Sequence, residues 1–141
     1  MYELTIISDF AAAHNLRQYE GECENLHGHN WKVEVTVASK RLNKIGLAVD
    51  FKVLKRALEG ILEKLDHKYL NDIPPFNKEN PSSENIARYI YQEFEKALSI
   101  PPNPPLPKGG RGDLKKGSKG GLKVAKVKVW ESDNAAATYY E

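Results

Sequence analysis

Hydrophobic and polar residues alternate through the first forty positions in a pattern typical of two β-strands. The first segment runs from Leu4 to His14, and residues 15–26 form a polar connection to the second. One face of the second segment carries its larger, mostly apolar side chains: His27, His29, Trp31, Val33, Val35 and Val37. Because such alternation is typical of half-buried antiparallel strands, we expect the two segments to pair as a hairpin with a long loop.

Two amphipathic helices are predicted next. Asp50 is a suitable N-cap for the first helix, and Pro81 followed by Ser82 and Ser83 is a start signal for the second. Apolar residues recur at three- and four-residue steps at Val53, Leu54, Ala57, Leu58, Ile61, Leu62 and Leu65, and again at Ile86, Ile90, Phe94 and Leu98. This spacing gives each helix one apolar face to bury.

Residues 101–121 are dominated by proline, glycine and lysine, so we expect a low-complexity, disordered or loosely ordered insertion there. A strand follows, with one face made of Ala125, Val127, Val129 and Glu131, and a turn at Asp133–Asn134 leads into a last short strand. The order predicts an α+β fold, with residues 1–141 as a single domain. We expect a four-stranded antiparallel sheet with both helices on one face, in the order ββααββ.

Charge and cysteine content exclude several classes of protein. The 141 residues include 21 Lys+Arg and 19 Asp+Glu, a net charge of +2, so nucleic acid is not suggested as a partner. The one cysteine excludes an internal disulfide. No apolar run approaches the ~20 residues of a membrane helix, and residues 1–10 lack a basic segment followed by an apolar one. We therefore expect a cytoplasmic protein with no membrane partner.

Three histidines are candidates for a metal site. His27 and His29 lie two residues apart on a strand and point the same way, and the expected hairpin would bring His14 to the same face. Three imidazoles are the protein ligand set of a catalytic zinc, which keeps a fourth position for water or substrate. A chance pair of half-exposed strand histidines is the alternative, but His14, with Cys23 nearby, favours metal binding.

Cys23 has two readings that its position does not separate. It lies four residues before His27 in a polar loop, where a nearby divalent cation would favour the thiolate, the form that accepts a proton. Alternatively, Cys23 is the fourth ligand of a closed, structural zinc site.

Two further acidic positions are candidates for proton transfer or ligand binding. Asp66 and His67 follow the first helix, where they either balance the helix dipole or form a carboxylate–imidazole pair for proton transfer. Glu131 is the one acid at the end of an otherwise apolar strand face. It either emerges into solvent or, if buried, accepts hydrogen bonds from a ligand with paired N–H groups.

Several motifs together resemble one known family. They are Phe10–His14, Cys23–Asn30, Val49–Phe51, Leu65–Asp72, Asn80–Asn85 and Trp130–Ser132. In order and spacing they resemble the pterin synthases of the tunnelling fold, the 6-pyruvoyltetrahydropterin synthase family. They are most similar to its branch that forms 6-carboxytetrahydropterin in queuosine biosynthesis. The resemblance covers nearly all of the chain except residues 101–121.

The resemblance implies a role for each candidate residue. The histidines matching His14, His27 and His29 hold Zn²⁺ in that family, and the cysteine matching Cys23 accepts a proton. The pair matching Asp66 and His67 is a proton relay, and the glutamate matching Glu131 anchors the pterin and is grouped with that relay. Ser82 replaces a threonine of the family and keeps the hydroxyl for substrate contact.

The activity that the resemblance implies is a zinc-dependent carbon–carbon cleavage. The family substrate is 7,8-dihydroneopterin triphosphate, and the products of this branch are 6-carboxy-5,6,7,8-tetrahydropterin, acetaldehyde and triphosphate. The family assembles as a homohexamer, a dimer of trimers, with sites at subunit boundaries and the relay pair supplied by a neighbouring chain.

Two alternatives remain open at this point. Glu24, beside Cys23, matches a glutamate that family members feeding folate synthesis use to cleave the side chain to 6-hydroxymethyl-dihydropterin. A non-enzymatic, zinc-stabilised binding module with Cys23 as a ligand is the other.

Overall fold

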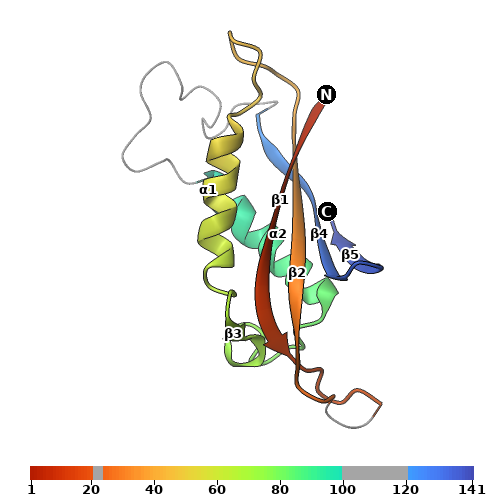
Figure 1. Ribbon diagram of the computed structural model, residues 1–141. Helices are drawn as coiled ribbons and strands as arrows, with labels where there is room; N and C mark the ends of the chain where they lie inside the picture. Colours follow the sequence, from red (N-terminus) through yellow and green to blue (C-terminus); the bar gives the residue numbers. More distant parts are fainter. Residues whose placement is uncertain (21–23, 100–120) are drawn as a thin grey trace.

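A computed structural model describes residues 1–20, 24–99 and 121–141 (Figure 1). Its strands are β1 (Tyr2–His14), β2 (His27–Ser39), β3 (Lys68–Tyr69), β4 (Lys123–Ser132) and β5 (Ala135–Tyr139), and its helices are α1 (Phe51–Leu62), α2 (Ser83–Ser99) and a 3-10 helix, η1 (Leu70–Asp72). Cys23 and the expected insertion at 101–121, apart from Gly121, lie outside the described residues. No described helix is long and apolar enough to cross a membrane.

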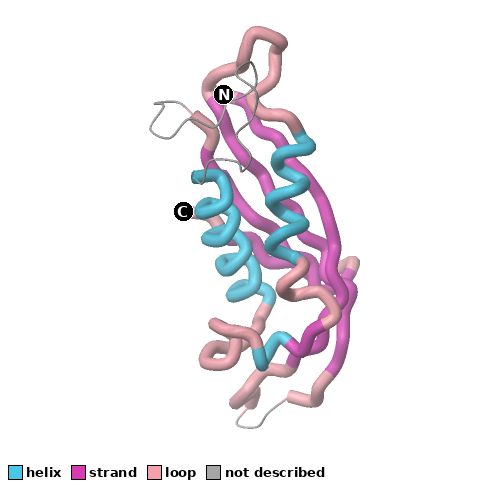
Figure 2. Tube along the Cα trace, turned by 90° about the vertical axis from the view of Figure 1, so that its left-hand side faces the viewer, coloured by secondary structure: helices cyan, strands magenta, loops and turns pink. Residues whose placement is uncertain are grey.

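The α+β prediction with two helices on one face of a sheet is confirmed, but the sheet differs from the expected one. Its described strands lie in the order β3-β1-β2-β4-β5, and β3 runs parallel to β1 while the other neighbours are antiparallel. Figure 2 shows both helices against the same face. The prediction of a four-stranded, purely antiparallel sheet was wrong because β3 is two residues long and shows no alternation.

The register of the β1–β2 hairpin places matching apolar residues opposite one another. Phe10 pairs with Trp31 and Ile6 pairs with Val35, and all four side chains are buried under the helices. Directly opposed residues of an antiparallel pair project to the same face, so the pairing joins the two alternating patterns into one core surface. The end of the same ladder is the pair His14 and His27.

β4 departs from the expected alternation at one point. The register between β2 and β4 shifts at Thr36 and Val37, so that Val124 lies opposite Val37 and is buried, while Ala125 is half-buried. The assignment of Ala125 to the face of Val127 was therefore wrong, because a bulge inserts one residue and reverses the direction of every side chain beyond it.

The two helices begin near the predicted caps. Asp50 Oδ1 accepts a hydrogen bond from the backbone N–H of Lys52 at 2.8 Å, and Ser82 Oγ accepts one from the N–H of Asn85 at 3.2 Å. α1 ends at Leu62 rather than continuing through Leu65, yet Leu65 is still fully buried in the following turns. Capping thus sets where α2 starts, close to the end of β1.

The core is expected to depend strongly on the apolar face of α1. Replacing the fully buried Leu54 with alanine leaves a cavity beneath the helix and should lower the free energy of unfolding by about 2–5 kcal/mol. Urea denaturation followed by circular dichroism measures the change. The neighbouring exposed Lys55→Ala is the control and should change stability by less than about 0.5 kcal/mol. Equal losses in the two variants would contradict the assigned helix face.

Candidate metal centre

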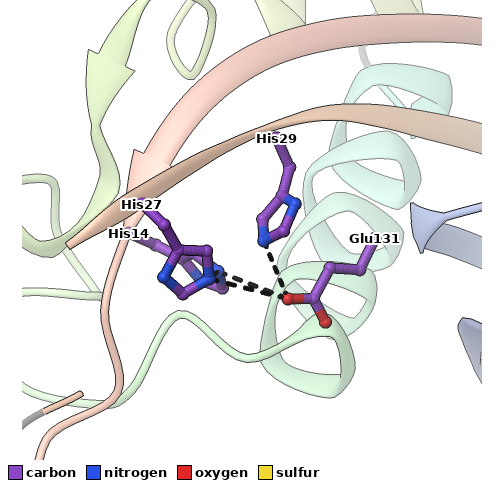
Figure 3. A group of neighbouring side chains, drawn as sticks. All are labelled: His14, His27, His29 and Glu131. Carbon is purple, nitrogen blue, oxygen red and sulfur yellow. Dashed lines mark hydrogen bonds and ion pairs between the residues drawn. The ribbon is translucent and has the colours of Figure 1, made fainter. Parts of the chain in front are cut away.

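Three histidines and one glutamate converge at the end of the sheet, on the face that the helices cover (Figure 3). His14 ends β1, and His27 and His29 begin β2, where His27 lies opposite His14 and His29 opposite Ala12. Glu131 comes from β4 and shares the face of the buried Val129, two residues before it. The hairpin therefore brings the predicted histidines together, and β4 adds a carboxylate.

The distances within this group suit a single small cation. The Nε2 atoms of His14 and His27 lie 3.1 Å apart, and one ligand atom from each of the four residues lies within 4.8 Å of all the others. Ligand nitrogens ~2.0–2.1 Å from a tetrahedral zinc lie about 3.3–3.4 Å from one another. Glu131 Oε1 is 3.0 Å from His29 Nε2, 3.5 Å from His14 Nε2 and 3.9 Å from His27 Nε2.

Backbone carbonyls hold two of the rings with their Nε2 atoms facing inward. His14 Nδ1 donates to the carbonyl of Pro81 and His27 Nδ1 donates to that of Asn25, each at 2.8 Å, because a carbonyl oxygen can only accept. In the neutral rings both Nε2 atoms then carry lone pairs, which face each other across 3.1 Å. A cation between them removes that repulsion, and a histidine that binds a metal usually donates its other ring N–H to a carbonyl or carboxylate in this way.

Burial disfavours a proton as that cation. The His14 side chain is only 2% exposed, and this desolvation lowers the pKa of its imidazole. His29 Nε2 is buried and makes no hydrogen bond within the described part of the chain, although the Glu131 carboxylate is near. Neutral imidazoles with inward lone pairs are donors that Zn²⁺ prefers, so the residues present fit the metal that the resemblance implied.

Trp31 packs against two of the histidines in this cluster. Its ring lies edge-on to His14 and His29, with centroids 4.8 Å and 5.3 Å away, and its Nε1 donates to the carbonyl of Ala12 at 3.3 Å. Trp31 is fully buried. His14 is therefore both packed against Trp31 and hydrogen-bonded through its Nδ1, whereas His27 has only the hydrogen bond and His29 only the packing.

The loop before β2 places Glu24 behind His27. Glu24 Oε1 accepts a hydrogen bond from the N–H of Leu16 at 3.3 Å and lies 3.7 Å from His27 Nδ1, the ring nitrogen opposite the Nε2 that faces the cluster. The backbone of Glu24 is also tied to Asn15, whose Nδ2 donates to its carbonyl at 3.1 Å. The loop is therefore anchored one residue beyond Cys23, which itself lies outside the described residues.

Asp66 and His67 form a pair, but at the outer edge of β1 and not in the cluster. Asp66 Oδ1 accepts from the N–H of Ala11 at 2.9 Å, and Oδ2 lies 3.0 Å from His67 Nδ1. The hydrogen bond from Ala11 is the main cause of a lowered pKa of the Asp66 carboxyl, and the contact with His67 adds to it. His67 has a φ of 57° and a side chain that is 82% exposed.

Sequence reasoning missed two residues that support the cluster. Ser83 Oγ donates to Glu131 Oε2 at 3.4 Å, whereas Ser82, the expected substrate contact, caps α2. The Arg17 guanidinium donates to the carbonyls of three residues that precede α2: Asn71, Phe76 and Glu79. No spacing or alternation marks either residue, because both act through segments that are distant in sequence.

Comparison with known proteins agrees with these features. The family model described as 6-pyruvoyl tetrahydropterin synthase matches residues 3–141. A Synechocystis sp. protein named 6-carboxy-5,6,7,8-tetrahydropterin synthase is 44% identical over 93 residues, covering 62% of this chain and 70% of that protein. A Pyrococcus furiosus protein named dihydroneopterin monophosphate aldolase is 38% identical over 91 residues, covering 64% of this chain and 73% of that protein.

The fold has close counterparts among solved structures. The 6-pyruvoyl tetrahydropterin synthase of Caenorhabditis elegans superimposes with a TM-score of 0.76 and 22% sequence identity, covering 99% of this chain and 95% of that one. At this level of identity the likeness concerns the arrangement of the helices and strands.

The cluster is expected to bind one zinc ion per chain. Removing one imidazole with His29→Ala should weaken zinc binding by more than the 10–100-fold that loss of an outer-shell partner typically costs. Competition with a chromophoric chelator measures the affinity. His67→Ala makes the same change at the exposed edge and should leave the affinity unchanged. Equal affinities of the two variants would show that the cluster does not hold the metal.

Proposed function

The chain belongs to the 6-pyruvoyl tetrahydropterin synthase family, and from that premise we propose that it is the lyase that forms 6-carboxy-5,6,7,8-tetrahydropterin. Its substrates are 7,8-dihydroneopterin triphosphate and one water, which supplies the additional oxygen of the products, and acetaldehyde and triphosphate are the other products. The observation that carries the proposal is the convergence of three inward-facing imidazole Nε2 atoms beside a carboxylate. The 44% identical Synechocystis relative, named for this reaction, supports the choice of product. We assign the reaction to queuosine biosynthesis.

The metal centre is proposed to hold Zn²⁺ through His14, His27 and His29. The bound ion would supply Lewis acidity, which makes the hydroxyls of the substrate side chain and the neighbouring C–H bonds more acidic. Glu131, with its side chain 36% exposed, would accept hydrogen bonds from the paired N–H groups of a pterin ring. That contact would orient the ring so that its side chain reaches the centre.

Two groups are proposed to move protons. The Cys23 thiolate would take a proton from the substrate side chain, a role supported by the resemblance and by the anchoring of Glu24 next to it. His67, whose Nδ1 is held by the Asp66 carboxylate, would return or accept a proton through its exposed Nε2. Together these transfers permit the internal redox rearrangement that precedes loss of triphosphate and acetaldehyde.

The position of the Asp66–His67 pair outside the metal cluster of its own chain supports an oligomeric enzyme. The Asp66–His67 pair lies at the β1 edge of the sheet, and β5 leaves a second edge at the other side. We propose that a neighbouring subunit supplies this pair to each metal centre, in a homohexamer built as a dimer of trimers. We also place the enzyme in the cytoplasm.

A second activity has a specific observation in its favour. Glu24 lies beside the metal centre, 3.7 Å from His27 Nδ1, and the Pyrococcus relative is named as an aldolase. In this alternative Glu24 is the base that cleaves the side chain to 6-hydroxymethyl-dihydropterin. Its carboxylate lies behind the His27 ring, away from the facing Nε2 atoms, which favours the first activity. Family membership favours either enzyme over a non-enzymatic zinc-stabilised module.

Product analysis separates these activities. With dihydroneopterin triphosphate, the zinc-loaded protein should give 6-carboxytetrahydropterin and acetaldehyde, detected by liquid chromatography. Cys23→Ala should retain zinc and lose at least about 10²-fold of this activity, since a positioned proton acceptor typically contributes 10²–10⁴-fold. Glu24→Gln should keep the carboxy product and lose any hydroxymethyl product. Formation of hydroxymethyl-dihydropterin alone, abolished by Glu24→Gln, would overturn the first activity in favour of the second.

A further inference from the structure

Glu131 lies where a fourth metal ligand would lie, although the proposed function requires it to hold the pterin. We infer that the Glu131 carboxylate binds the metal in the substrate-free protein and leaves it when a pterin ring docks. Binding of the metal by Glu131 follows from the geometry of the cluster alone. The release of Glu131 from the metal when a pterin docks rests on the proposed function.

One oxygen of the carboxylate faces all three imidazoles. Glu131 Oε1 is 3.0, 3.5 and 3.9 Å from the Nε2 atoms of His29, His14 and His27, whereas Oε2 is turned toward Ser83 Oγ at 3.4 Å (Figure 3). Three nitrogens and one carboxylate oxygen are a complete donor set for a four-coordinate zinc. A carboxylate ligand also brings a negative charge to the group, which strengthens cation binding.

The four donors are not held equally. The His14 side chain is 2% exposed and hydrogen-bonded to a backbone carbonyl. The Glu131 side chain is 36% exposed, and its hydrogen bond from Ser83 Oγ, within the described part of the chain, is long at 3.4 Å. The register between β4 and β5 shifts between Trp130, which pairs with Ala136, and Ser132, which pairs with Ala135. Glu131 therefore has no opposite residue in this strand pairing. Bulges redirect side chains and leave the extra residue unpaired, which makes Glu131 the donor that moves at least cost.

Pterin binding and metal binding compete for the same atom. Paired N–H donors of a pterin ring would need both carboxylate oxygens, and Oε1 is the one that faces the imidazoles. Docking of the ring therefore releases the fourth position, where the hydroxyls of the substrate side chain need it. The resting centre is closed by four protein donors and opens only in the complex.

Metal binding by the Glu131 carboxylate is tested on cobalt-substituted protein without any substrate. Glu131→Gln should weaken metal binding at least about tenfold, because the loss of a ligand exceeds that of an outer-shell partner, and should alter the visible absorption of Co²⁺. Glu34→Gln is the matched control: it makes the same change on the neighbouring strand, where Glu34 Oε2 accepts from Trp130 Nε1 at 2.7 Å. An affinity and spectrum of Glu131→Gln equal to those of this control would overturn the inference.

The exchange is tested by adding unsubstituted pterin, which lacks the side chain that reaches the metal. Its binding should shift the Co²⁺ spectrum of the wild-type protein toward that of Glu131→Gln, and by reciprocity should lower the metal affinity. A spectrum unchanged at saturating pterin, with binding verified by calorimetry, would overturn the exchange. Absence of pterin binding would count against the proposed function and the exchange together, while the metal titration would still decide the ligand role.

Discussion

The antiparallel pairing of β1 with β2 is the constraint on which the metal centre depends. Its register puts Phe10 against Trp31 in the core and, at the end of the same ladder, His14 against His27. A slip of one residue would turn the apolar set to the opposite face of the sheet, so burial of that set fixes the register. The energy that places the imidazoles therefore comes from apolar burial along the strands.

The rings that the hairpin brings together are oriented by distant backbone. His14 is held by the carbonyl of Pro81, at the start of α2, and His27 by that of Asn25 in its own loop. Arg17 ties the loop after β1 to the segment before α2, and its backbone N–H donates to Asn80 Oδ1 at 2.8 Å. The start of α2 thus makes two contacts with the centre: the Pro81 carbonyl accepts from His14, and Ser83 Oγ donates to Glu131.

The candidate metal centre and the Asp66–His67 pair lie on different parts of one sheet. The imidazole cluster lies on the face that the helices cover, where burial lowers the pKa of His14 and its Nδ1 donates to the Pro81 carbonyl. The Asp66–His67 pair lies on the outer edge of β1, hydrogen-bonded to Ala11 and exposed. Of the four residues in the centre His14 is buried and the other three are partly exposed, whereas the His67 side chain is 82% exposed.

The sequence by itself determined the alternating strands, the helix faces and the convergence of His14, His27 and His29, because periodicity and a hairpin are local properties of the chain. Only the tertiary structure decided the pairing of β3 with β1, the bulge at Thr36 and Val37, and the approach of Glu131 to the imidazoles. Each of these depends on segments far apart in sequence. Their positions follow from packing in three dimensions, which no periodic pattern records.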